Sequence, residues 1–297
     1  MRLAVVIINW NHHGATWQRV QAIKDWKRIK PKIIIVDNGS SDRSSLYEQL
    51  REQTIFVESE VNKGFAGGNN LGITKALELR ASHVLLLNTD VDLTENDVDQ
   101  LLQSLENDHK IGAIGPLLNN VRNQKTYAGG RDLALHLDTR LEWEPTSAHA
   151  QIYEVDYVPG TVFLTRTELF AKAGLLDEQF FFGGSTADWC FRIRQMGYNT
   201  CIDTKLQAIH SASDPAGLRS SLYVYYSLRN RFLFVEKWHQ KKRNTLRHRW
   251  LYRCMRQLIG ALVRGRFRKS RAIWLALHHG RKGVFGNQNH LFMKTGL

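Results

Sequence analysis

A short polar segment follows a strongly apolar run near residue 87, and its side chains are the first in this sequence that could do chemistry. Residues 84–87 are all apolar, as in a buried strand, and residues 88–92 (NTDVD) follow them directly. In open α/β sheets, ligands bind at the carboxyl ends of the strands. The carboxylates of Asp90 and Asp92 would suit Mg²⁺ or Mn²⁺ bound with a substrate diphosphate, since these cations take few protein carboxylates and complete their shell with phosphate and water. The alternative is a polar turn in which an Asp caps the next helix.

Three earlier segments show the elements that would position these carboxylates. Residues 3–8, 32–36 and 54–58 are apolar or β-branched runs, each followed by a polar loop and a helical pattern. This alternation predicts an α/β fold with a mostly parallel, doubly wound sheet and helices on both faces. Because parallel strands end at one edge, the polar residues after them are expected to lie together.

The loop before the third helical pattern is rich in glycine and asparagine. Residues 62–70 read NKGFAGGNN and lead into a helix that extends to about residue 79. Backbone N–H groups at a helix N-terminus can hold phosphate, whereas the alternative is a tight turn with close helix packing. A dinucleotide fingerprint would have to follow the first strand, so the spacing argues against a nicotinamide enzyme.

The positive charge is concentrated at the end of the chain. The whole chain carries +13, and residues 217–297 contain nineteen Lys and Arg against one acid, Glu236, so residues 1–216 are net acidic. We therefore expect one α/β domain over residues 1–216 and a basic helical extension over 217–297. Such a charge excess predicts an anionic partner.

Two basic helices are predicted in this extension, at residues 246–263 and 267–279. In the first, apolar residues recur at helical spacing, and the arginines fall largely on another face. Such helices can lie on an anionic membrane. The alternative is that the apolar stripe packs on the catalytic domain or on a second subunit, as in a homodimer. No nucleic-acid-binding motif is present, so we expect no nucleic-acid partner.

No signal peptide or membrane-spanning run is recognised, which predicts a cytoplasmic protein held peripherally at the inner face of the plasma membrane. The three cysteines are odd in number and lack metal-ligand spacing, so reduced and mostly buried thiols are expected. They are Cys190, Cys201 and Cys254.

Several ordered motifs together resemble one enzyme family. VVIINWN, IIIVDNGSSD, NKGFAGGNN and LLLNTD are similar to the nucleotide-sugar-binding half of family 2 glycosyltransferases with the GT-A fold, most of all bacterial rhamnosyltransferases. The resemblance continues through IGAIGPLL, YVPGTVFLTRTELFAKAGLLDEQFF, DWCFRIRQMGY and YYSLRNRF, and so covers roughly the first 240 residues. It implies a GT-A fold and inverting transfer of a sugar from a nucleotide donor.

For the donor, a dTDP- or UDP-sugar, the resemblance implies contacts at the strand ends. Asn9 would lie near the base, Asp37 would bond the pyrimidine ring N–H, and the loop at residues 62–70 would surround the nucleotide sugar. For Asp37 the alternative is a turn bond to Gly39 or Ser40. The full set of implied donor contacts is Asn9, Asp37, Asn38, Asn62, Gly64, Phe65, Gly67, Asn69, Asn70 and Asn88.

For the metal, the resemblance matches residues 88–90 to the family's Asp-x-Asp motif, with Asn at its first position. Asp90 is then the expected ligand and Asp92 an outer contact. His210 stands where the family often has a histidine near the metal. Imidazole is a more natural ligand for Mn²⁺ than for Mg²⁺.

For the acceptor, the resemblance predicts an acidic pair whose second member is the general base, but these positions hold Ser185 and Thr186. Neither hydroxyl is a base near neutral pH. Asp188 could act instead if the neighbouring glycine loop moves, or it could cap the following helix in a Ser185-x-x-Asp188 capping box. Alternatively, Asp156 or Asp177 activates the acceptor, or the chain binds nucleotide sugar without efficient turnover.

If the chain is active, the resemblance implies transfer of a sugar, plausibly rhamnose from dTDP-rhamnose, to a glycan or lipid-linked precursor of a cell-surface polysaccharide.

Overall fold

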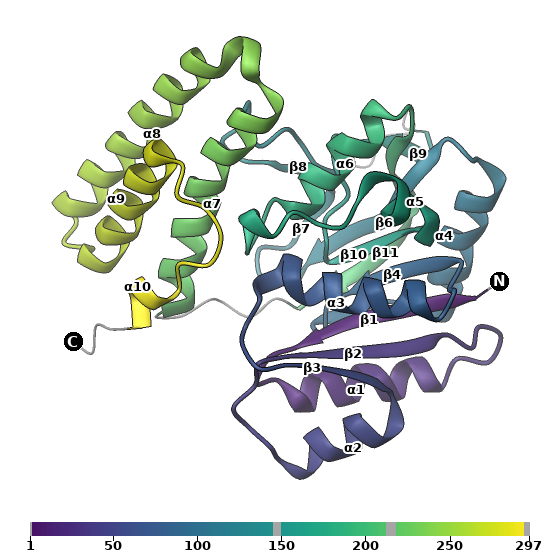
Figure 1. Ribbon diagram of the computed structural model, residues 1–297. Helices are drawn as coiled ribbons and strands as arrows, with labels where there is room; N and C mark the ends of the chain where they lie inside the picture. The colour runs from purple at the N-terminus through teal and green to yellow at the C-terminus, as the bar shows by residue number, and fades with distance from the viewer. Residues whose placement is uncertain (1, 145–149, 212–217, 294–297) are drawn as a thin grey trace.

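The computed structural model describes residues 2–144, 150–211 and 218–293. Its central feature is one mixed sheet whose main path runs β3-β2-β1-β4-β10-β6-β11-β5. The first four strands of this path are parallel to one another (Figure 1). They are β1 (Leu3–Asn9), β2 (Lys32–Asn38), β3 (Ile55–Ser59) and β4 (His83–Leu87).

Beyond β4 the sheet is mixed, because β10 and β5 each run antiparallel to their neighbours on the main path. β10 (Val162–Arg166) is antiparallel to both β4 and β6 (Ile111–Asn120), and β11 (Asn199–His210) is again parallel to β6. The short β5 (Val91–Asp92) pairs antiparallel with the end of β11, so the chain after β4 is tied to it. The remaining strands at the margin are β7 (Lys125–Gly130), β8 (Arg140–Glu142) and β9 (Ile152–Glu154).

Helices cover both faces of the sheet, as the alternating pattern predicts. Leu3, Val5 and Ile7 of β1 pack with α1 (His13–Lys24) and α4 (Glu95–Asn107) in one core. Their neighbours Ala4 and Val6 point the other way and pack with the helices of the opposite layer. These helices are α3 (Gly64–Glu78), α5 (Thr167–Ala173) and α6 (Ser185–Gln195), while α2 (Ser45–Gln53) flanks the β3 side.

The end of the chain forms a helical extension beside the carboxyl edge of the parallel strands (Figure 1). It consists of α7 (Leu218–Trp238), α8 (Arg243–Val263), α9 (Phe267–Lys282) and the single turn α10 (His290–Met293). A third core joins this extension to the first part of the chain, because Phe180, Phe181 and Ala187 are buried together with Phe232 and Trp250. The predicted domain boundary at residues 216 and 217 lies outside the described residues.

The apolar stripe predicted for residues 246–263 is divided in the structure. Leu246, Trp250, Cys254 and Leu258 are buried in the third core, whereas Ile259 is 55% exposed. Part of the stripe therefore packs within the chain, in agreement with the packing alternative, whereas Met255, Ile259 and Leu262 are exposed. In the part of the chain that is described, no helix has the length and apolar character of a membrane span.

All three cysteines are free and buried, as expected. Burial raises the pKa of each thiol to about 12, so they are poor nucleophiles in the native state.

Candidate active site

The ends of β1 and β2 bring two predicted donor contacts together. Asn9 and Asp37 face each other across the parallel register, and the Asn9 Nδ2 donates to Asp37 Oδ1 over 3.0 Å. The Thr16 hydroxyl on α1 fixes the Asn9 amide by donating to its Oδ1 over 2.8 Å. Both Asn9 and Asp37 are fully buried, so this polar pair lies beneath the protein surface at the carboxyl ends of β1 and β2.

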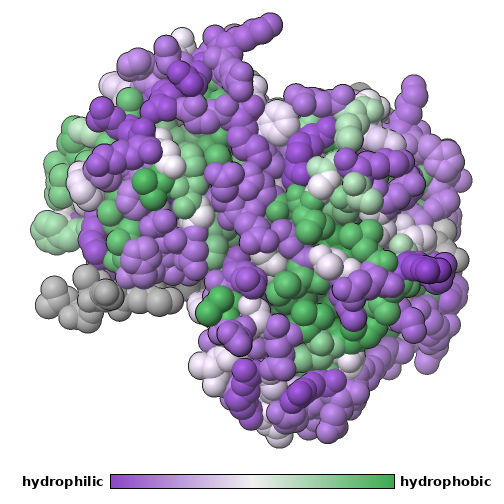
Figure 2. Space-filling model, viewed as in Figure 1, coloured by the Kyte–Doolittle hydropathy of each residue, from purple (hydrophilic) through white to green (hydrophobic). Residues whose placement is uncertain are grey.

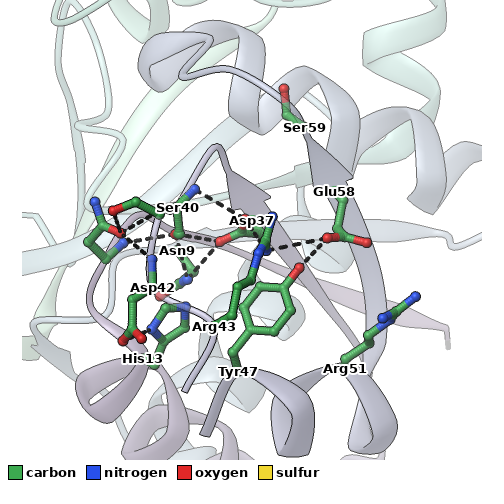
Figure 3. Close-up of polar contacts among 12 residues, drawn as sticks. Asn9, His13, Asp37, Ser40, Asp42, Arg43, Tyr47, Arg51, Glu58 and Ser59 are labelled. Carbon is green, nitrogen blue, oxygen red and sulfur yellow. Dashed lines mark hydrogen bonds and ion pairs between the residues drawn. The ribbon is translucent and has the colours of Figure 1, made fainter. Parts of the chain in front are cut away.

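Asp37 is the centre of a wider polar network (Figure 3). The Ser40 hydroxyl donates to Oδ1 over 2.5 Å, and the Ser40 backbone N–H donates to Oδ2 over 3.2 Å, which is the turn bond of the alternative interpretation. The half-exposed Arg43 lies 3.5 Å from Asp37 Oδ2, 3.4 Å from Glu58 Oε1 and over the Tyr47 ring. Arg43 is thus the outward-facing member of the network, and a contact between Asp37 and a pyrimidine ring stays a prediction.

A second buried amide holds the glycine loop to β2. Asn38 donates from Nδ2 to the Gly64 carbonyl over 3.0 Å and accepts the Lys63 N–H at Oδ1 over 2.9 Å. The Asn62 Oδ1 accepts the Gly64 N–H over 2.8 Å. Asn38 and Asn62 therefore shape the loop, and their contact with a nucleotide stays a prediction.

The backbone at the start of α3 is already engaged by the protein. The N–H groups of Phe65 and Ala66 both point at the Phe181 carbonyl, at 2.7 and 3.4 Å. Gly64 has φ +72°, and a Cβ there would lie 2.4 Å from the same carbonyl oxygen, while a Cβ on Gly67 would lie 2.7 Å from Lys63 Cβ. These glycines serve close packing, so the structure corrects the interpretation of this helix start as a phosphate cradle.

Two further predicted donor contacts have structural roles instead. Asn69 donates to the Phe65 carbonyl over 2.9 Å within α3 and is buried. Asn70 is also buried, donates to the Leu176 carbonyl and accepts the Leu176 N–H, both over 2.9 Å. The Asn69 amide is therefore used within α3, the Asn70 amide joins α3 to the loop at Leu176, and a contact of either with a donor stays a prediction.

The predicted metal ligands Asp90 and His210 do come together. Asp90 follows β4, and the pairing of β5 with β11 brings His210 Nε2 to 3.3 Å from Asp90 Oδ2. Their side chains are 38% and 20% exposed. Burial alone would raise the pKa of Asp90, but the hydrogen bond and charge of His210 hold it below the usual value. Asn88, the first residue of the motif, is half-buried at the end of β4 and donates its backbone N–H to the Thr161 carbonyl over 3.1 Å.

Asp92 does not join this pair. Its carboxylate is 68% exposed and lies 2.6 Å from Arg19 Nη2 on α1. Neither aspartate caps the next helix, because α4 is capped by the reciprocal pair of Thr94 and Asp97. Across residues 2–144, 150–211 and 218–293, no three His, Cys, Asp or Glu side chains form a metal-binding group.

The Asp90 and His210 pair still fits a divalent cation of the expected kind. One carboxylate and one imidazole leave most coordination positions to diphosphate oxygens and water, which is how Mg²⁺ and Mn²⁺ are usually held with a phosphorylated substrate. The imidazole favours Mn²⁺.

Asp188 lies in a different setting from the one that either interpretation predicted. It is fully buried one turn into α6, where Oδ1 lies 2.6 Å from Lys237 Nζ and accepts the Trp238 Nε1–H over 3.0 Å. Its Oδ2 lies 3.2 Å from Arg192 Nε. Gly184, without a side chain, is the N-cap of α6, so there is no capping box. We therefore correct both predictions: Asp188 is neither an accessible base nor a cap.

The other proposed substitutes for the base are also paired with cations. Asp177 Oδ2 lies 2.6 Å from Lys237 Nζ, and Asp156 Oδ1 lies 3.0 Å from Arg194 Nη1. Ser185 and Thr186 are buried at the start of α6.

Sequence reasoning missed a group of buried residues on α7 that hold the loop at residues 179–183, which we call the acceptor-side loop because it precedes the positions where the resemblance predicted the acceptor's base. Asn230 Nδ2 points at the carbonyls of Phe180, Phe182 and Gly183 at 2.7–2.9 Å. Arg229 donates from Nη2 to the Gln179 carbonyl over 2.9 Å. The neighbouring Arg231 donates to the carbonyls of residues 133, 136 and 137. The available signal was the motif YYSLRNRF, in which two arginines and an asparagine, all rich in N–H donors, lie within an aromatic helical pattern.

Comparison with known proteins identifies the class. Residues 4–174 match the model of "Glycosyl transferase family 2", which is more than half of the chain. The chain belongs to this family, and its sheet with an Asp90 turn at the strand edge is the GT-A fold.

Individual relatives agree with this class. The chain is 28% identical over 242 residues to the low-salt glycan biosynthesis hexosyltransferase Agl10 of Haloferax volcanii, a match that covers 78% of this chain and 74% of the relative. It is 22% identical over 227 residues to the dTDP-rhamnosyl transferase RfbF of Shigella flexneri, covering 73% and 75%. It is 20% identical over 271 residues to an N-acetylglucosaminyl-diphospho-decaprenol L-rhamnosyltransferase of Mycobacterium tuberculosis, covering 81% and 88%.

Solved structures show the same fold. GalNAc-T7 with UDP, GalNAc and Mn²⁺ superposes with a TM-score of 0.62 at 19% identity, over 80% of this chain but only 48% of that one. The mannosyltransferase PcManGT of Pyrobaculum calidifontis, in complex with GDP-Man and Mn²⁺, gives a TM-score of 0.57 at 13% identity, over 94% and 87%. At these identities the likeness concerns the fold alone.

Proposed function

We propose that this family 2 glycosyltransferase moves a hexosyl group from a nucleoside diphosphate donor with inversion at the anomeric carbon. The observation that supports this best is the Asp90–His210 pair, 3.3 Å apart and accessible, at the turn that follows β4. A divalent cation bound there would neutralise charge that grows on the leaving diphosphate. Asp90 suits this role because its pKa lies below the usual value, which keeps the carboxylate ionised.

For the donor we propose dTDP-rhamnose first and a UDP-sugar second. The support is that relatives over most of the chain are named as rhamnosyl transferases, one of them as a dTDP-rhamnosyl transferase. The pyrimidine would lie over the network of Asn9, Asp37 and Arg43, where buried polar groups discriminate against bases that leave them unpaired.

For the acceptor we propose a glycan carried on a lipid diphosphate, as a precursor of a cell-surface polysaccharide. One relative is named for a sugar linked to decaprenyl diphosphate, and this supports a lipid-linked substrate. The transfer would take place at the cytoplasmic face of a membrane. Since Asp188 is enclosed by Lys237 and Trp238, we assign the acceptor's proton to a group other than Asp188.

The second candidate is a nucleotide-sugar-binding homologue with weak or no turnover. One specific observation favours it: the positions of the expected acidic pair are Ser185 and Thr186, and both are buried. Losing a positioned base typically costs about 10²–10⁴ in rate.

The test has two stages. Nucleotide sugars are screened by thermal shift with Mn²⁺ or Mg²⁺, and we expect a dTDP- or UDP-sugar to raise the melting temperature only with metal. Nucleotide release is then measured with a lipid-diphosphate-linked sugar acceptor. Release above the acceptor-free rate supports the enzyme, and metal-dependent binding without release supports the binding homologue. Donor binding that survives a chelator and the Asp90→Asn substitution would refute the proposed site.

A further inference from the structure

Helix α8 carries two apolar faces, and only one of them is buried. The face toward α7 and α9 belongs to the third core. On the other side, large apolar side chains recur at intervals of three and four residues, which places them on one face of the helix. Val263 is 83% exposed and Tyr252 is 64% exposed. We call this face the apolar ridge, formed by Tyr252, Met255, Ile259, Leu262 and Val263.

A groove with a volume of about 530 Å³ lies beside the ridge, where α8 ends and α9 begins. Arg256 and Gly260 line it, and each follows a ridge residue by one position. They therefore lie about 100° around the helix axis from that residue, on the flank of the ridge. Five cationic side chains line this basic groove: Arg253, Arg256, Arg264, Arg266 and Lys269.

The charge of the basic groove is not balanced by the chain. Glu236, the one acid after residue 216, lies before α8 and pairs with Arg243 and Arg247 near the opposite end of that helix. Among the described residues, none of the five groove cations has an ion-pair partner. The Nη1 atom of Arg253 is buried and, within the same residues, has no hydrogen-bond partner.

The start of α9 adds to the positive electrostatic potential of the basic groove. Arg266 is the N-cap of this sixteen-residue helix, so the positive end of the helix dipole faces the groove. Figure 2 shows hydrophobic surface among hydrophilic side chains on the helical extension, in line with a ridge bordered by charge.

A strong positive groove directly beside an exposed apolar ridge matches an amphiphile with an anionic head. A soluble anion would use the groove alone and leave the ridge in water. A lipid bilayer uses both, because its headgroup phosphates meet the cations and its acyl boundary accepts the apolar side chains.

We infer that the corner of α8 and α9 is a docking site for a bilayer of anionic phospholipid, with a headgroup phosphate in the basic groove and the apolar ridge in the acyl boundary. The inference deepens the membrane part of the proposed function and names its surface. It is tested without donor or acceptor, so a failure of sugar transfer would leave it standing.

The test is flotation of the full chain with vesicles of phosphatidylcholine, with and without phosphatidylglycerol. Neutralising two groove charges in Arg256→Gln/Arg264→Gln is expected to lower partitioning onto the anionic vesicles by about 25-fold, since each basic residue near the surface contributes about a five-fold factor. The ridge variant Val263→Asn is expected to lower partitioning as well. Unchanged melting temperatures would show that these exposed substitutions leave the fold intact.

A matched control removes the same charge elsewhere. Lys241→Gln/Lys242→Gln changes two exposed lysines at the other end of α8, about 30 Å away along the helix and beyond the Debye length of about 10 Å. It should change partitioning by less than about 3-fold.

Four outcomes would overturn the inference. One is equal loss in the groove and control variants. Another is a thermal shift with inorganic phosphate that depends on the groove while the chain stays off vesicles. The third is retention on single-stranded nucleic acid with the same dependence on the groove. The last is a dimer in sedimentation that Val263→Asn dissociates, which would assign the ridge to a second copy.

Discussion

Asp90 and Asp188 are two carboxylates on sequence motifs, and they lie in opposite environments. Asp90 is 38% exposed and, within the described residues, pairs with the His210 imidazole at 3.3 Å. Asp188 is fully buried and is surrounded by Lys237, Trp238 and Arg192. A carboxylate with one exchangeable partner is available to a ligand, whereas one enclosed by several donors is part of the fold. The number and kind of partners therefore separate the chemical role from the structural one.

The elements that carry the two residues explain this difference. Asp90 lies in a turn at the edge of the sheet, where the pairing of β5 with β11 brings the His210 imidazole to it. Asp188 lies on α6, and the end of α7 supplies its amine and indole donors.

The largest effect is expected for Asp90→Asn. Losing the metal carboxylate removes several kcal/mol of transition-state stabilisation, which corresponds to about 10²–10³-fold in turnover. The measurement is nucleotide release with Mn²⁺. The control is Asp92→Asn, which removes only an exposed ion pair with Arg19 and should change turnover less than about 3-fold. Equal losses of turnover in the two variants would contradict the prediction that Asp90 and not Asp92 acts in catalysis.

A stability loss without a specific catalytic effect is expected for Asp188→Asn. The substitution removes the buried carboxylate that Lys237 shares with Asp177 and that faces Arg192, which costs about 3 kcal/mol. Urea denaturation measures this loss. Combining the change with Lys237→Met should cost less than the sum of the two, because both single changes remove the same pair interaction. Unchanged stability with lost transfer would instead restore Asp188 as the base.

A somewhat smaller loss is expected for Asn230→Ala. Three loop carbonyls lose their amide donor, and leaving buried acceptors unsatisfied costs about 2 kcal/mol. The measurement is again the free energy of unfolding. Asn244→Ala on the exposed face of α8 is the matched control and should stay within about 0.5 kcal/mol of the parent. A neutral Asn230→Ala would show that the acceptor-side loop does not depend on α7.

The smallest effect concerns the pH dependence of Asp90. Since its folded pKa is depressed, its contribution to stability is present above the ordinary Asp pKa of about 3.9 and is lost as the pH falls through the folded value. His210→Asn removes the main lowering contact, so the loss of stability below that pH should become shallower. Unfolding free energies across the acidic range check this, and an unchanged slope would mean that His210 does not set the state of Asp90.

Much of the fold could be predicted because it is encoded in local runs. The buried segment at residues 3–8 is β1, and the helix predicted from residue 267 is α9. The antiparallel insertion of β10 between β4 and β6 could not be predicted, since a strand's own residues do not determine its direction. The direction of such a strand is determined by contacts between residues that are far apart in the sequence.

The position of a site residue could be predicted where a sequence motif lies at the end of a strand. It could not be predicted where the partners of the residue come from an element far along the chain. Asp90 and His210 lie close together, as predicted, because Asp90 follows β4 and His210 is the last residue of β11 in the same sheet. The role of Asp188 depends on Lys237, which is 49 positions later in a stretch that composition marked only as basic. Asn69 and Asn70 share a polar loop motif with Asn62, but α3 begins at Gly64 and turns both amides into the protein.

The last segment of the chain has a consequence for how the enzyme is made. The Gly286 N–H donates to the Gln179 carbonyl over 2.8 Å, and Arg229 donates to the Gly286 carbonyl over 2.6 Å. Synthesis proceeds from the N-terminus, so the sheet can assemble on the ribosome while residue 286 is still unmade. The loop at residues 179–183 receives its contact from Gly286 only after the extension has emerged. A nascent chain can thus complete its parallel strands before this loop has its last support from the extension.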